Sequence, residues 1–263
     1  MSAWLSLTKK ELRLGMPVFL MPIIVFIVSV SIAFYIGNRN GFAWEAVVGV
    51  AAAATGVQIF YLAYYLFYSL QSEKKKLHLW LHNPMPGYSL LLAKVAAGFV
   101  SMLITLLLTG TTVLVTVNLS SMINEQIQVA NITELVFFAG IHLVLLALSF
   151  AAFFLFYWMI FLVFTRRLGT VVSFLSTFVI FVALTSFYNW FTQSLVYQKL
   201  TMWGGFQLEM LEGISFNVDN SGAEVMSETA NLSLFAGSYL FETILALLLF
   251  FAASWMLDKK VEV

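Results

Sequence analysis

Few side chains in this chain combine a reactive type with a useful spacing. His78 and His82 are four residues apart, so on a helix they would share one face and could hold a metal ion. No third histidine or cysteine lies near them, and Glu73 is poorly placed as a further ligand. We therefore expect no metal site and favour a contact role for the pair. Phosphate-loop and H-E-x-x-H motifs are missing, so we expect no ATP hydrolysis and no enzyme activity on this chain.

Two ionisable residues, His142 and Glu242, lie within long apolar runs. Glu242 is ten residues beyond Leu232, which is about 15 Å of helix, and His142 lies about 12 Å beyond Glu134 by the same rise. Because the two residues lie at similar depth, they are candidate partners for each other: a lone carboxylate in hydrocarbon is costly. The alternative is a protonated Glu242 that bonds to backbone or to Ser238.

The elements that must carry these residues are membrane spans. Of the 263 residues, 61% are apolar and 10% charged, and the mean hydropathy is +0.93. These values predict an all-α integral membrane protein with a single domain over residues 1–263 and no soluble catalytic domain. Windows of about 20 apolar residues predict six helices at 16–37, 44–70, 90–117, 134–164, 168–191 and 232–257.

Lysine and arginine set the expected orientation. All of the 13 basic residues except Arg39 and Lys199 fall on one side of the six spans, so we expect both termini to be cytoplasmic in a bacterial plasma membrane. The N-terminus lacks a cleavage pattern, so the first run should remain as a span. The pattern of residues 1–15 predicts an amphipathic helix on the inner leaflet, although Glu11 and Thr8 fall within its apolar arc. The alternative is a frayed basic tail.

Residues 71–88, between the second and third spans, form an unusual connection. Three lysines are followed by an apolar face with Leu77 and Trp80, and a helix stop comes at 83–87. One interpretation is a helix that another protein grips, and the other is a helix lying on the inner leaflet.

A second long connection, at 192–231, lies on the outer side. Its first half is apolar enough for one or two short helices with a break at the glycine pair 204–205, and its second half is typical of a polar loop.

Taken together, these features resemble the ABC-2-type permease, the membrane subunit of an ATP-binding-cassette exporter. The resemblance rests on the Lys-Lys-Glu-x-Arg run at 9–13, six spans, and a loop from Glu73 through Leu77 and Pro84 to the Leu-Leu-Leu-Ala-Lys run at 90–94. The long outer segment before the sixth span also fits. Pro86 and the pair of histidines depart from the family's usual loop.

The resemblance implies partners and site residues. Two copies of a separate ATPase would carry ATP and Mg²⁺, and this chain would hold no cofactor. A second permease, identical or a paralogue, would complete a dimer in the bilayer, and the net charge of zero points to no nucleic acid. The coupling helix would be Glu73, Lys74, Lys75, Lys76, Leu77, His78, Leu79, Trp80, Leu81 and His82.

The resemblance also places the second and fifth spans along the substrate path. The residues that would line it are Gln58, Tyr61, Tyr65, Tyr68, Thr170, Ser173 and Thr177. Helix packing and the interfacial aromatic belt are the alternative roles for them. The expected substrate is an amphipathic peptide, an antibiotic or a lipid-like molecule; its identity, the direction of transport and the choice between homodimer and heterodimer are left open.

A secondary transporter or channel that needs no ATPase is the alternative function. Such a protein should show paired charges or broken helices near mid-membrane, together with internal repeats. The sequence shows one strong intramembrane acid, Glu242, and no repeat of three spans.

Overall fold

The computed structural model describes residues 3–74, 85–120, 129–219 and 222–261. Within them are six helices long and apolar enough to cross a membrane, at Met16–Asn40, Ala43–Glu73, Gly87–Leu119, Val136–Leu168, Thr170–Thr192 and Ala236–Lys259. The sequence prediction of a multi-pass membrane protein is therefore confirmed, with span ends that differ from the predicted ones by a few residues.

The N-terminal part forms a short helix and a tight helical hairpin. Helix α1 (Ala3–Leu14) is followed at Gly15 by α2 (Met16–Asn40), which has a proline in its first turn and Pro22 inside it. Helix α2 ends at Gly41, whose φ of 82° is in the left-handed region that favours glycine and whose N–H donates to the carbonyl of Gly37. Only two residues then separate α2 from α3.

The second span is not one continuous α-helix. Helix α3 (Ala43–Val57) passes through the 3₁₀ turn η1 (Gln58–Phe60) into α4 (Tyr61–Lys74). No proline accounts for this turn, and a 3₁₀ stretch inside a helix often marks a hinge. Since Gln58 is the central residue of Ala43–Glu73, the break lies at the middle of the span.

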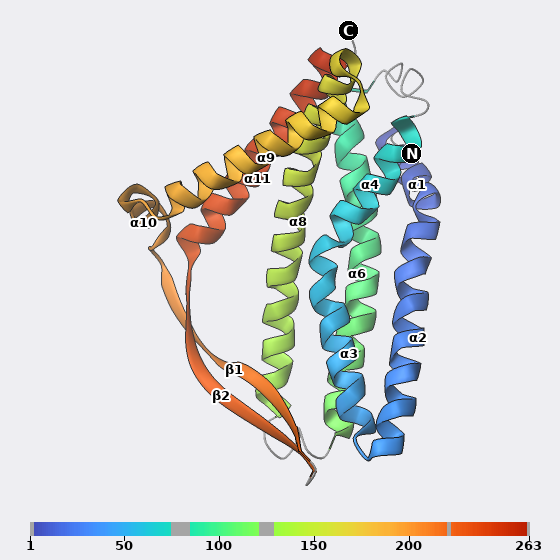
Figure 1. Ribbon diagram of the computed structural model, residues 1–263, viewed down its shortest axis with the longest axis vertical. Coiled ribbons are helices and arrows are strands. Elements are labelled where there is room, and N and C mark those ends of the chain that lie inside the picture. The colour runs from blue at the N-terminus through green and yellow to red at the C-terminus, as the bar shows by residue number, and fades with distance from the viewer. Residues whose placement is uncertain (1–2, 75–84, 121–128, 220–221, 262–263) are drawn as a thin grey trace.

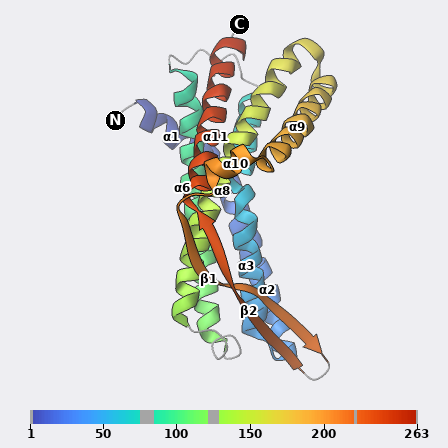
Figure 2. The ribbon, with the colours of Figure 1, turned by 90° about the vertical axis from the view of Figure 1, so that its left-hand side faces the viewer.

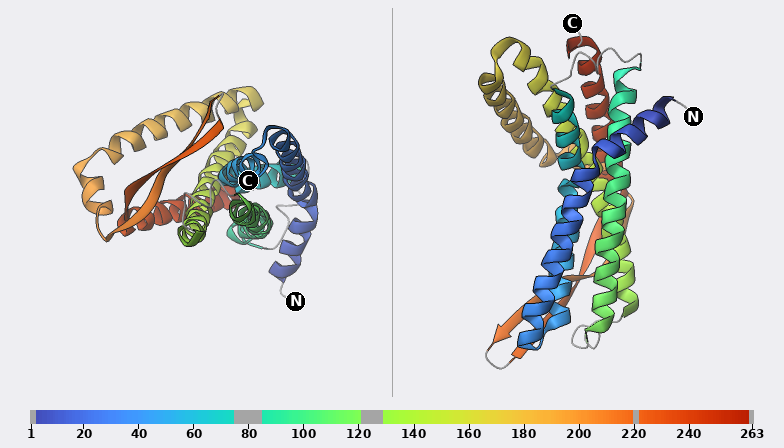
Figure 3. Two further views of the ribbon diagram at one scale, coloured as in Figure 1. Left: turned by 90° about the horizontal axis from the view of Figure 1, so that it is seen from below. Right: turned by 90° about the vertical axis from the view of Figure 1, so that its right-hand side faces the viewer.

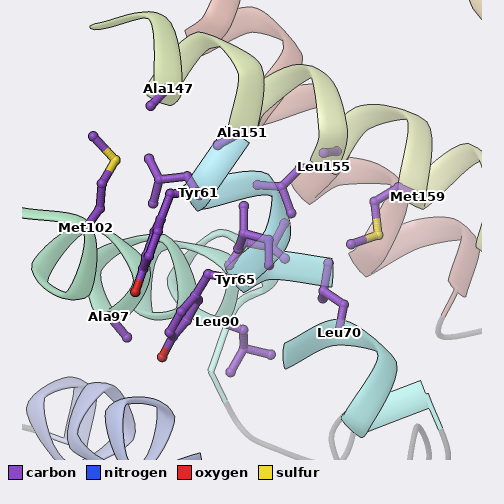
Figure 4. Close-up of a cluster of buried hydrophobic side chains, with 14 of the residues drawn as sticks. Tyr61, Tyr65, Leu70, Leu90, Ala97, Met102, Ala147, Ala151, Leu155 and Met159 are labelled. Carbon is purple, nitrogen blue, oxygen red and sulfur yellow. The ribbon is translucent and has the colours of Figure 1, made fainter. Parts of the chain in front are cut away.

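Helices α6 (Gly87–Leu119) and α8 (Val129–Leu168) pack with α4 and the end of α11 to form the main core. Tyr61 and Tyr65 of α4 lie side by side in it, beside Ala97 of α6, with Leu155 and Met159 contributed by α8 (Figure 4). Gly98 makes this contact possible, because a Cβ there would lie 2.8 Å from Cδ1 of Tyr65.

The long connection at 192–231 differs from the prediction. One short helix, α10 (Leu195–Thr201), is followed by Gly204, with φ of 65°, as expected. The second short helix and the polar loop are replaced by an antiparallel hairpin of β1 (Gly205–Asp219) and β2 (Gly222–Phe235). Its register runs from Gly205 opposite Phe235 to Asp219 opposite Gly222, with an irregularity between Leu211 and Gly213.

Helix α9 (Thr170–Thr192) precedes this outer segment, and α11 (Ala236–Met256) with the short π turn η2 (Leu257–Val261) follows it. The N- and C-terminal ends lie at the same end of the molecule, and the hairpin extends to the opposite end, near the α2–α3 turn (Figures 1 and 2). Helices α2, α3, α6 and α8 run nearly parallel, whereas α9 leaves the bundle obliquely (Figures 1 and 3).

Candidate functional site

A buried cluster of charged side chains joins three helices at the end of the bundle that holds the termini. The ammonium group of Lys94 lies 3.0 Å from Oε2 of Glu11 and 2.7 Å from Oε2 of Glu73. It also donates to the Ser69 hydroxyl at 2.8 Å, and that hydroxyl donates to Oε2 of Glu11 at 2.9 Å. The side chains of Lys94 and Glu11 are each only 1% exposed, and that of Glu73 is 12% exposed.

The helical repeat explains how these groups meet. Tyr65, Ser69 and Glu73 are four residues apart along α4, so they form one stripe. Glu11 faces this stripe from α1: its side chain accepts from Ser69, and its backbone carbonyl accepts from the Tyr65 hydroxyl at 2.9 Å. The apolar arc of α1 contains Glu11 because that arc faces the protein, where Lys94 binds the carboxylate.

Burial makes this cluster a strong constraint on helix position. Two carboxylates share one buried ammonium, and a second cation, Lys10, lies 4.0 Å from Glu73 at the surface. Taking charges out of water is expensive, so a buried pair adds little net stability but is costly to break. The cluster therefore fixes α1 against α4 and α6.

The cluster lies directly beside the predicted coupling segment. Glu73 is bonded within the cluster, Lys74 ends α4, and the other eight predicted coupling residues, at 75–82, lie outside the described residues. On the far side of that segment, the Gly87 N–H donates to Oδ1 of Asp258 at 2.8 Å, and Met85 packs against the main core. Both flanks of the segment are thus attached to membrane helices.

Three of the four residues predicted to line a path in the second span are buried within this chain. Tyr61 and Tyr65 are 6% and 1% exposed and belong to the main core, and Gln58 is 6% exposed. Tyr68 alone of this group is exposed. Packing, the alternative role given above, accounts for the position of Tyr65 within this chain.

The predicted residues of the fifth span lie elsewhere, on α9. Thr170 is exposed, the buried Ser173 hydroxyl donates to the carbonyl of Gly169, and the Thr177 hydroxyl donates to that of Ser173. The main neighbours of α9 are α8 and α10. The two predicted groups are therefore not brought together within this chain.

The intramembrane residues His142 and Glu242 each have a tyrosine partner. Tyr188 of α9 donates to Oε1 of Glu242, and the Tyr239 hydroxyl lies 3.1 Å from Nδ1 of His142. No His142–Glu242 ion pair occurs among the described residues, and the Ser238 hydroxyl donates to Phe235 rather than to Glu242. The bond from Tyr188 is a partner of Glu242 that reasoning from depth alone does not identify.

His142, Tyr239 and Glu242 line the same cavity between α8 and α11, which has a volume of about 800 Å³. The rest of its wall is largely apolar, with Leu92, Phe250 and Phe251 toward the other end. Its size is in the range of ligand-binding pockets. No group of three or more His, Cys, Asp or Glu side chains suitable for a metal ion occurs in the described part of the chain.

Comparison with known proteins gives no further assignment: no family model, curated protein or solved structure matches this chain.

Proposed function

We propose that this chain is the membrane subunit of an ABC-2-type exporter, driven by ATP that a separate ATPase hydrolyses. The observation that carries the proposal is the buried cluster of Lys94, Glu11 and Glu73. The cluster connects the N-terminal helix α1 to the spans α4 and α6, at the point where the segment 75–84 begins. Force applied to that segment by a partner would pass directly into α4 and α6.

In this proposal, residues 74–82 sit in a cleft of the ATPase, Glu73 of the predicted coupling helix stays bonded to Lys94 in the cluster, and α1 lies beside the segment. Desolvated leucine and tryptophan contacts supply the affinity, and the lysines at 74–76 steer the approach of the partner. Two such chains, or one with a paralogue, form the exporter in a bacterial plasma membrane with both termini cytoplasmic. The largely apolar cavity with its few polar groups suits an amphipathic cargo.

The test is a pull-down of an ABC ATPase that co-purifies with the unaltered chain, using the Trp80→Ala variant or the paired variant Leu77→Asp and Leu81→Asp. The membrane fold should persist, because the segment lies outside the spans, while ATPase association or substrate-stimulated hydrolysis is lost. Trp190→Ala is the matched control, since Trp190 is an exposed tryptophan on α9. Normal complex and turnover with Trp80→Ala would refute the coupling role and favour a helix on the inner leaflet.

Two observations favour the secondary transporter as a second candidate. The second span is broken at η1, and His142 and Glu242 face one intramembrane cavity. Vesicles that contain only this chain separate the two functions. Substrate movement driven by an imposed proton gradient, without any ATPase, would establish the second candidate in place of the first.

A further inference from the structure

A second cavity, of about 520 Å³, lies between the first three spans. Its walls are α2, the broken second span and α6, which stand side by side in Figure 1 and in the right-hand view of Figure 3. Helices α2 and α3 touch tightly near their connecting turn, where a Cβ on Gly37 would lie 2.8 Å from Cα of Ala43. The cavity occupies the space between them farther along, toward Pro22.

This cavity is centred on the middle of the membrane. Gln58 is the central residue of its span, Ser29 lies next to the centre of Met16–Asn40, and Thr105 lies near that of Gly87–Leu119. All three residues line the cavity. Side chains three residues apart eclipse in a 3₁₀ turn, so η1 directs Gln58 and Tyr61 to the same wall.

Gln58, which lines this cavity, has an unused hydrogen-bonding group. Its Nε2 donates to Oγ1 of Thr109 at 2.9 Å, whereas its Oε1 is buried without a partner among the described residues. Exchanging the two ends of the amide would leave the amino group without a partner instead. In either arrangement one polar end is unpaired in a low-dielectric setting, where an unpaired group is costly.

We propose that this cavity binds an uncharged amphiphile that carries a hydroxyl group. A hydroxyl both donates and accepts, so it satisfies whichever end of the Gln58 amide is free. None of the residues that line the cavity is Asp, Glu, Lys or Arg, so the wall offers no counter-ion to a charged head group. The remaining wall, including Phe26, Val57 and Leu108, suits a hydrocarbon chain. The inference does not depend on the proposed ATPase partner.

The test uses the full-length chain in lipid nanodiscs and a long-chain alcohol that carries a photoreactive diazirine on its chain. Matched probes are the corresponding alkane, which has no polar group, and the corresponding carboxylic acid. We expect the alcohol to label the cavity wall near Phe26 and Val57, and an unlabelled alcohol to compete. The alkane can neither donate nor accept a hydrogen bond and the acid brings a charge, so both should label this site weakly.

Gln58→Leu keeps the volume of the side chain but removes both polar ends. We expect the half-saturating concentration of the alcohol to rise about three- to tenfold, the range that single hydrogen bonds give in membrane and soluble proteins. Gln71→Leu is the matched control, because Gln71 is exposed on the same span, away from the cavity. Ala54→Phe fills the cavity without altering Gln58 and should abolish labelling.

Several outcomes would overturn the proposal. Equal labelling of the wall by alcohol and alkane, or by alcohol and acid, would show that the hydroxyl is not recognised. Unchanged labelling of Gln58→Leu would show that the Gln58 amide does not bind the hydroxyl group. If Gln58→Leu does not fold, full labelling of Ala54→Phe refutes the site by itself.

Discussion

Replacing Lys94 with methionine should destabilise the chain strongly, although methionine fills nearly the same volume. The substitution removes an ammonium group that lies 3.0 Å from Glu11, 2.7 Å from Glu73 and 2.8 Å from the Ser69 hydroxyl. Two carboxylates would then remain close together at the buried junction. The free-energy cost is therefore that of leaving buried carboxylates without their partner, and not the smaller cost of losing a surface ion pair.

Removing one member of a buried pair costs about 3–5 kcal/mol. A protein of comparable length loses about 2–4 °C of melting temperature per kcal/mol, which gives a decrease of about 6–20 °C. Thermal unfolding in detergent, followed by tryptophan fluorescence, measures this decrease. Because the cluster is buried, added salt should change the difference little.

Lys9→Met is the control, because Lys9 is exposed on α1, and a surface charge contributes about 0–1 kcal/mol. The double variant Lys94→Met with Glu11→Gln should recover part of the loss, since one unpaired carboxylate is then neutral. A Lys94→Met protein that melts within about 2 °C of the Lys9→Met protein would contradict the reasoning.

The remaining predictions concern packing and the intramembrane acid. Gly98→Ala should lower the free energy of unfolding by about 1–3 kcal/mol, because the added methyl group overpacks against Tyr65. Gly110→Ala on the same helix is the control: its methyl group meets no atom within 4 Å, so the change should be neutral or slightly stabilising. Equal melting temperatures of the two variants would argue against the close contact of α4 with α6. Glu242→Gln should be mild, because an amide still accepts from Tyr188, whereas Glu242→Leu should reduce expression or transport; a Leu variant that behaves like Gln in membrane yield and uptake would remove any role for the bond.

The spans can be predicted from sequence because each is a nearly charge-free run of sufficient length. The charged cluster cannot be predicted in this way, because nothing in the sequence distinguishes Lys94 from the other lysines on the same side of the spans. One signal is present: Glu11 interrupts the apolar arc of the first helix, which is costly unless a partner is buried there. Only the fold identifies Lys94 and Ser69 as that partner.

The hairpin and the η1 break differ from the sequence prediction for two other reasons. Phe206, Leu208 and Met210 alternate with other residues, and the Asn-Ser-Gly run at 220–222 is a turn sequence, so a strand signal is present beside the apolar content that favours short helices. The break at Gln58 has no such signal, because neither proline nor a glycine pair marks it. We attribute the position of this break to tertiary packing.

The attachment of Glu11 to Lys94 also has a consequence for synthesis. The two residues are 83 positions apart, and at about 5–20 residues per second a ribosome needs about 4–17 s to make the intervening chain. The first two spans are therefore complete before the cation that Glu11 binds has been made. The N-terminal helix can reach its final position only after the third span begins to emerge. Insertion of that span therefore determines when the contact between Glu11 and Lys94 can form.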